Sequence, residues 1–226
     1  MRRGFTTGLV LACTLASAIA IAGCGAAPAT TGGRADQAPT PANTGGSDTG
    51  ASDLVPAGYG SLRQDDISVK VRLQTVLVRA IPLDESVIRL LSPDSYRALR
   101  ELRDGGGRRE QAQRAASRVG VQDPSLWYVS YFGLQPDAQY VSGDMNIVSG
   151  GRDYRPLDLI PLTAGFGSQR VRQREVQSAI YIFDHGIDTD HPLTVTVQSV
   201  PTTSWTQVIP VIERERALVR SRARGS

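Results

Sequence analysis

The stretch Leu126-Trp-Tyr-Val-Ser-Tyr-Phe-Gly-Leu134 decides the fold of this 226-residue chain. Side chains of a β-strand point alternately to its two faces, so Trp127, Val129 and Tyr131 lie on one face. Tyr128, Phe132 and Leu134 lie on the other. Both faces are apolar, and this pattern predicts a central strand of a sheet that is covered on both sides.

Other short runs rich in β-branched residues lie on both sides of this strand. Glycine-containing turns separate several of the later runs, at Gly150-Gly151, at Ala164-Gly165 and at Gly186. About seven short strands at this spacing predict an antiparallel β-sandwich. The remaining predicted strands are 67–73, 75–83, 145–148, 152–162, 175–183 and 192–200.

Two stretches have the pattern of helices instead. Residues 92–119 begin with Ser92-Pro93, a typical N-cap and first helical position, and a triple glycine at 105–107 divides them into two helices. Ser204 is expected to cap an amphipathic C-terminal helix over 204–224, in which Pro210 marks either a kink or the start. The predicted class is therefore mainly β with added helices: a sandwich, a helical insertion and a C-terminal helix.

Three segments within residues 126–200 resemble the Ig-like, telokin-like sandwich modules of extracytoplasmic bacterial lipoproteins. They are Trp127–Phe132, Gly151–Pro156 and the strand pair Ser178–Asp184 with Pro192–Val197. Gln135-Pro136 stands where many such modules have an Asn after the central strand, and the helical insertion departs from their pattern. The resemblance implies an Ig-like sandwich that serves as a binding or adaptor domain.

The N-terminus has the order of a secretory signal. Arg2 and Arg3 precede an apolar run, Leu9 to Ala22, which is too short to span a bilayer as a stable helix. It ends in Ile21-Ala22-Gly23-Cys24, which resembles the lipobox of a bacterial lipoprotein precursor. The resemblance implies diacylglycerol transfer to the Cys24 sulfur, cleavage after Gly23 and acylation of the new amino terminus with palmitate-type chains. The alternatives are an ordinary cleaved signal with Cys24 incidental, or a retained membrane anchor.

Residues 24–55 are expected to tether the lipidated Cys24 to a folded domain at 56–226. Of residues 25–55, 23 are Gly, Ala, Pro, Thr or Ser. Such a composition cannot bury enough apolar surface to offset the entropy lost on ordering. We therefore expect a cell-envelope protein bound to the lipid bilayer. Gly25 follows the cysteine, whereas Asp there favours inner-membrane retention in some bacteria, so the outer membrane is mildly favoured.

Charge and cysteine content exclude several function classes. The chain has 25 basic and 22 acidic residues, and this small excess of +3 argues against nucleic acid as a partner. Both cysteines precede residue 25, so the domain has no thiol for a disulfide, a thiolate metal site or nucleophilic attack. No catalytic constellation and no cofactor motif is recognisable.

One polar cluster contains both histidines of the chain: Asp184, His185, Asp188, Asp190 and His191. Imidazole nitrogens and carboxylate oxygens could form a metal site, although the spacing matches neither an EF-hand nor an HExxH helix. The other interpretation is a polar connection between strands, in which Gly186 and the Asp residues favour turns.

The sequence leaves three functions open. The favoured one is a lipid-anchored binding or adaptor module with a partner protein in the envelope. The second is a metal-dependent hydrolase that uses the Asp184–His191 cluster. The third is a structural protein that contacts peptidoglycan or lipopolysaccharide through two Arg-rich stretches, with seven Arg in 92–119 and five in 204–224. Those stretches could equally be solvated helix faces.

Overall fold

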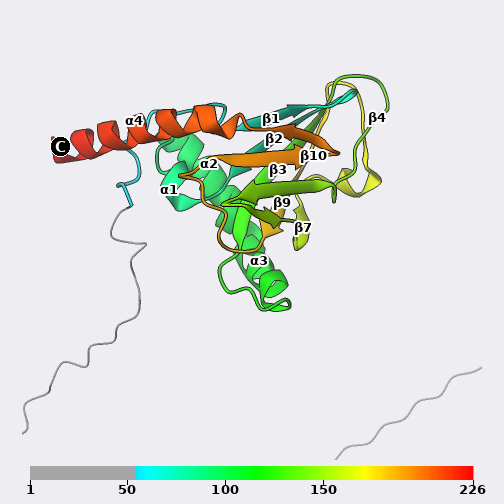
Figure 1. Ribbon diagram of the computed structural model, residues 1–226, viewed down its shortest axis with the longest axis horizontal. Helices are drawn as coiled ribbons and strands as arrows, with labels where there is room; N and C mark the ends of the chain where they lie inside the picture. Colours follow the sequence, from blue (N-terminus) through cyan, green and yellow to red (C-terminus); the bar gives the residue numbers. More distant parts are fainter. Residues whose placement is uncertain (1–53, 226) are drawn as a thin grey trace, which may run out of the picture. The chain divides into compact units, whose positions relative to one another are not determined.

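A five-stranded antiparallel sheet forms the centre of the computed structural model, which describes residues 54–225 (Figure 1). The strand order is β1-β2-β3-β9-β7, and every neighbouring pair is antiparallel. The strands are β1 (Val69–Arg72), β2 (Val76–Pro82), β3 (Ser125–Gly133), β9 (Val176–Phe183) and β7 (Asp158–Pro161).

Strand β3 lies in the middle of this sheet, as its sequence predicts. It pairs with β2 along one side and with β9 along the other. Trp127, Val129 and Tyr131 are fully buried on one face, and Ser130 is buried on the other. Its neighbour β9 is buried on both faces over Gln177–Phe183, and these two strands therefore place the largest side chains of the core.

A second antiparallel sheet contributes to the same hydrophobic core. Its order is β11-β10-β5-β6, and Ile147 of β5 and Val195 of β10 are fully buried. A separate two-stranded ribbon pairs β4 with β8. The bounds are β5 (Met145–Ser149), β6 (Arg152–Tyr154), β10 (Leu193–Val197), β11 (Val200–Thr202), β4 (Ala138–Gln139) and β8 (Arg170–Val171).

The prediction of one strand over 152–162 is wrong. This stretch forms β6 in the four-stranded sheet and β7 in the five-stranded sheet, and the chain crosses between the sheets at Arg155–Leu157. Pro156 lacks the N–H that a continuous ladder would need, so pairing stops there. The described residues contain eleven strands where the sequence predicts about seven, because β4, β6, β8 and β11 are two or three residues long.

Three tyrosines cross-link the core through their hydroxyl groups. The Tyr181 hydroxyl donates a hydrogen bond to the carbonyl of Ser142 at 2.6 Å. The hydroxyl oxygens of Tyr131 and Tyr181 also lie 2.6 Å apart, and because the Tyr181 hydrogen is already used, Tyr131 is the donor in this second bond. Tyr140 stacks on Tyr131 with ring centroids 4.1 Å apart and bonds the Phe166 carbonyl. Burial raises the pKa of Tyr140 to about 12 and also raises the pKa values of the other two, so all three hydroxyls stay protonated at neutral pH.

We expect Tyr181→Phe to lower the free energy of unfolding by about 1–2 kcal/mol, because the Ser142 carbonyl and the Tyr131 hydroxyl lose a buried partner. Urea unfolding measures the change. Tyr128→Phe is the matched control, since Tyr128 lies on the opposite face of β3 and its hydroxyl has no hydrogen bond within residues 54–225. Equal losses in the two variants would contradict a role for the hydroxyl network.

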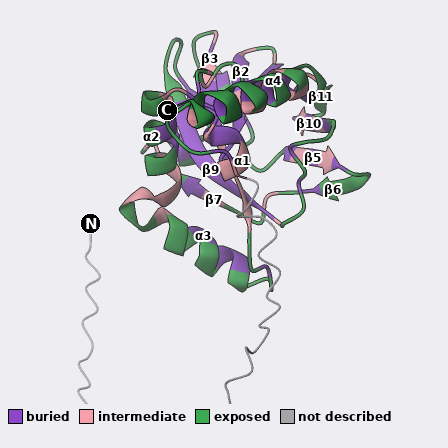
Figure 2. Cartoon of the chain, turned by 90° about the vertical axis from the view of Figure 1, so that its left-hand side faces the viewer, coloured by how far each residue is buried: buried purple, intermediate pink, exposed green. Residues whose placement is uncertain are grey.

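The predicted helical insertion is present as two helices. Helix α2 (Pro93–Asp104) follows the short α1 (Glu85–Ile88), and α3 (Arg108–Ser117) packs against β7 and β9. Ala112, Ala115 and Ala116 form the buried side of α3, and apart from the half-buried Arg108 the rest of the helix is exposed (Figure 2). Ser92 occupies the predicted N-cap position of α2, but its hydroxyl bonds the Ser95 hydroxyl and not the backbone.

Helix α4 (Trp205–Arg224) confirms the predicted C-terminal helix and packs on the body of the protein. It starts at Trp205 and continues through Pro210, and Ser204 at its N-cap position makes no side-chain capping bond. Trp205 is fully buried, lies 6.2 Å from the Trp127 ring and donates its Nε1–H to the Thr189 carbonyl. Figure 1 shows α4 extending away from the sheets at its C-terminal end.

The first described segment is fastened to α4 by a buried carboxylate. Oε1 of Glu215 accepts hydrogen bonds from the backbone N–H and the hydroxyl of Ser61, at 2.8 and 2.9 Å, and from Arg222 at 2.8 Å. Arg222 also donates to the Tyr59 carbonyl. A Cβ on Gly60 would lie 2.2 Å from the Leu90 carbonyl group, so only glycine fits at this contact. We call Ser61, Glu215 and Arg222 the terminal clamp.

Candidate functional site

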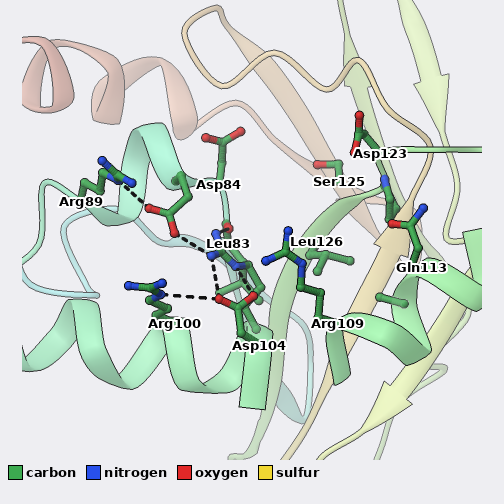
Figure 3. Close-up of a pocket in the computed structure, with 14 residues that line it drawn as sticks. Leu83, Asp84, Arg89, Arg100, Asp104, Arg109, Gln113, Asp123, Ser125 and Leu126 are labelled. Carbon is green, nitrogen blue, oxygen red and sulfur yellow. Dashed lines mark hydrogen bonds and ion pairs between the residues drawn. The ribbon is translucent and has the colours of Figure 1, made fainter. Parts of the chain in front are cut away.

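A cavity of about 440 Å³ opens between the three short helices and the start of β3 (Figure 3). This volume falls within the range typical of small-molecule sites. Four arginines and four acidic residues dominate its lining. They are Arg89, Arg100, Arg103, Arg109, Asp84, Glu85, Asp104 and Asp123.

The turn between α2 and α3 brings these side chains together. Gly106 and Gly107 have φ values of 61° and 71°, in the left-handed region that favours glycine. The chain reverses there, and the C-terminal half of α2 and the first half of α3 line the same cavity. The Asp84 carboxylate caps α1 by accepting the Ser86 N–H at 2.7 Å.

Arg103 is the centre of an ion-pair network in this cavity. Its Nη2 lies 2.6 Å from Glu85 and 2.8 Å from Asp104, and its Nε donates to the second oxygen of Asp104 at 2.8 Å. Glu85 also accepts from Arg89 at 2.7 Å. Only 15% of the Arg103 side chain is exposed, which makes this pairing stronger than at the surface.

The network fixes the charge state of its members. Burial raises the pKa of Glu85, but hydrogen bonds from Arg89 and Arg103 outweigh it, and the net shift is downward. The hydrogen bonds from Arg103 are the main reason that the pKa of Asp104 is also lowered. Hydrogen bonds to Asp104 and Glu85 raise the pKa of Arg103. All three groups therefore remain charged across the physiological pH range.

Two arginines beside this network, Arg100 and Arg109, make weaker contacts with the carboxylates or none. Arg100 is 59% exposed; its Nε lies 3.6 Å from Asp104, beyond hydrogen-bond distance, and its Nη1 makes one long hydrogen bond of 3.4 Å to the Tyr96 hydroxyl. Arg109 is exposed and has no hydrogen bond or ion pair with any described residue. In Figure 3 the Arg109 side chain points from α3 toward the middle of the cavity. These guanidinium groups can bind an anion that enters it.

The structure places the Asp184–His191 candidates in the connection between β9 and β10, in separate pairs. His185 Nδ1 lies 2.8 Å from Asp184, and His191 Nδ1 lies 2.7 Å from Asp188. Asp190 pairs instead with Arg216 of α4 at 2.6 Å. Within residues 54–225, no group of three or more His, Cys, Asp or Glu side chains is placed to hold a metal ion.

This connection has a structural task that the sequence does not reveal. It is tied to α4 through the Thr189 carbonyl, which accepts from Trp205, and through the pair of Asp190 with Arg216. Asp184 and Asp188 also accept backbone N–H groups one and two residues further along, as turn-forming Asp residues do. These contacts agree with the interpretation of the segment as a polar connection.

Cys24, the predicted lipidation site, lies outside the described residues, as do the predicted signal peptide and nearly all of the tether. In the part of the chain that the structure describes, no helix is both long enough and apolar enough to cross a membrane.

The arginines of 92–119 are evident in the sequence, but the cavity that some of them line is not. The available signal was the triple glycine at 105–107, which implies that two Arg-rich helices fold back on each other. Glu85 carried no signal, because it lies in a helix of four residues and its partner Arg103 is 18 residues away. Comparison with protein-family models, curated proteins and solved structures finds no match to this chain.

Proposed function

We propose that the protein is a lipoprotein of the bacterial cell envelope, anchored through acylated Cys24, whose β-rich domain is a binding or adaptor module. The observation that carries this proposal is the sequence Ile21-Ala22-Gly23-Cys24 directly after an apolar run of signal-peptide length. Two or three acyl chains provide stable anchoring, whereas a single chain gives only marginal binding. Gly25 makes the outer membrane the favoured location.

The described domain supports the binding part of this proposal. It begins at the end of the Gly/Ala/Pro/Thr-rich segment, and its two larger antiparallel sheets share one core, which fits an Ig-like sandwich. It also has a preformed polar cavity lined by charged side chains. Arginines and carboxylates are groups that hold a polar ligand through charge-assisted hydrogen bonds.

The other two functions have less support. The Asp184–His191 side chains form separate pairs, so they provide no ligand set for a metal-dependent hydrolase. Contact with peptidoglycan or lipopolysaccharide needs free basic side chains, yet many arginines of the two Arg-rich stretches pair within the domain. Examples are Arg97 with Asp94, Arg103 with Asp104, Arg216 with Asp190 and Arg222 with Glu215.

Cys24→Ser is expected to abolish acylation and membrane association completely, because the thiol is the lipid acceptor. The full chain is expressed in a bacterium with radiolabelled palmitate, and the label and the membrane fraction are measured. Cys13→Ser is the matched control and should retain both, since Cys13 lies inside the apolar run. Unchanged labelling in Cys24→Ser would overturn the lipoprotein assignment.

The binding role is tested by cross-linking in intact cells and mass spectrometry of what co-purifies with the full-length protein. One dominant envelope component, recovered with the wild type and reduced in Cys24→Ser, would support an anchored adaptor. Recovery of the same component with both proteins would show that anchoring is not needed for the partnership. Absence of any partner would contradict the adaptor role and leave the small-molecule cavity as the binding site.

A further inference from the structure

Around Glu85 and Asp104 the lining of the cavity has more arginines than carboxylates. Glu85 and Asp104 are the two carboxylates of the ion-pair network; Arg103 bonds both of them and Arg89 bonds Glu85, at 2.6–2.8 Å. Arg100 and Arg109 remain beside them. Both affect the same carboxylate, because the positive charges of Arg109 and Arg100 each contribute to lowering the pKa of Asp104. Four guanidinium groups thus surround two carboxylates.

Arg109 is the residue with the fewest partners in this arrangement. It makes no hydrogen bond or ion pair within residues 54–225, although it points into a cavity that contains acidic side chains. Ser125 also lines the cavity and supplies a hydrogen-bond donor. Its hydroxyl oxygen accepts a hydrogen bond from Trp127 Nε1 at 3.3 Å, and its hydroxyl hydrogen has no acceptor among the described residues. A planar guanidinium and a hydroxyl together suit an oxyanion.

The acidic residues at the edge limit the size and charge of the ligand. Asp84 and Asp123 line the same cavity, and Asp123 has no hydrogen bond or ion pair within the described part of the chain. They balance the arginines, so the lining as a whole has no formal net charge. An extended polyanion would meet repulsion from both carboxylates. A volume of about 440 Å³ also admits a small molecule and not a polymer.

We infer that this cavity binds a small molecule through a single carboxylate or phosphate group. Arg109 and Arg100 bind that group with their guanidinium groups, and the Ser125 hydroxyl donates a further hydrogen bond to it. Arg103 is a positioning residue, because its bonds to Glu85 and Asp104 hold the floor in place. The inference deepens the binding role proposed above, but it does not depend on the lipid anchor.

The test measures anion binding by the full-length chain in detergent. Inorganic phosphate and acetate are titrated separately at constant ionic strength, with chloride as the balancing salt, and binding is followed by calorimetry and by the shift of Tm. Wild type is expected to bind at least one of the two anions. Arg109→Gln should weaken that binding about tenfold or more, which is the loss expected for one hydrogen bond to a charged group.

Arg114→Gln is the matched control, because Arg114 is exposed on the same helix, is not part of the cavity lining and should leave affinity unchanged. Both variants should unfold at the wild-type Tm without added anion, since neither side chain has a hydrogen-bond or ion-pair partner within residues 54–225. Preference for phosphate or for acetate identifies the ligand class. Equal loss in both variants, or no binding of either anion by wild type, would overturn the inference, whereas the palmitate experiment would be unaffected.

Discussion

Replacing Trp205 with alanine is expected to reduce the free energy of unfolding by about 3–5 kcal/mol, the cost of removing a large aromatic side chain from a packed core. Trp205 is fully buried and packs on Trp127 of β3. The change also leaves the Thr189 carbonyl without its donor at 3.0 Å. Guanidinium-induced unfolding, followed by far-UV circular dichroism, measures the loss.

Leu218→Ala is the matched control on the same helix. Leu218 is 43% exposed, so its truncation should change stability by no more than about 0.5 kcal/mol. A small effect of Trp205→Ala, close to that of Leu218→Ala, would mean that α4 is dispensable to the core. The full effect would establish that the C-terminal helix folds with the sheets as one cooperative unit.

Replacing Glu215 with alanine should cost about 2–3 kcal/mol, because it removes the acceptor of three hydrogen bonds in the terminal clamp. The Ser61 backbone N–H then loses its partner beside a closely packed segment. Arg222 is 40% exposed and can regain water, which places the expected loss below that of a fully buried ion pair. Urea unfolding measures it, and Glu213→Ala, an exposed position two residues earlier, is the control.

The contribution of Glu215 should depend on pH. Burial raises its pKa, but the hydrogen bonds from Arg222 and Ser61 outweigh burial, and the net pKa in the folded protein lies below the ordinary value. A lowered folded-state pKa means stability that is present above the unfolded value of about 4.3 and is lost as the pH falls through the folded value. The stabilities of wild type and Glu215→Gln should therefore approach each other as the pH falls from about 4.3 through the lower folded-state value. A constant difference between pH 7 and pH 3 would contradict this account.

The parts of the fold that follow local rules could be predicted from the sequence. The strand at 126–134 is central because both of its faces are apolar, and the two helices of 92–119 are separated where three glycines occur. The stripe of Trp205, Val208, Ile212 and Val219 is buried, as helical periodicity requires. Local pattern failed at residues 152–162, since alternation cannot show that the two halves of one apparent strand belong to different sheets.

The cavity could not be predicted because its decisive contacts are long-range. Arg103 is one of seven arginines in the insertion, and only the fold distinguishes it from Arg97, which pairs with a neighbour at the surface. The partners of Arg103 come from two different elements, the short α1 and the end of α2. In the same way, the cluster at 184–191 left open a metal site or a polar connection, and only the fold shows that Asp184 pairs with Arg152 and Asp190 with Arg216.

The terminal clamp has a mechanical consequence. In the tethered protein that we propose, a pull between the membrane and a partner would enter the domain at its N-terminal side, near Tyr59 and Ser61. At this point Tyr59 and Ser61 are hydrogen-bonded to Arg222 and Glu215, which lie 154 or more residues further along the chain. The backbone of Leu62 is also hydrogen-bonded to the backbones of Leu90 and Ser92. Force applied at the tether is thus shared with the last helix from the start. Unfolding that starts at the N-terminus therefore has to break the bonds of Tyr59 and Ser61 to α4.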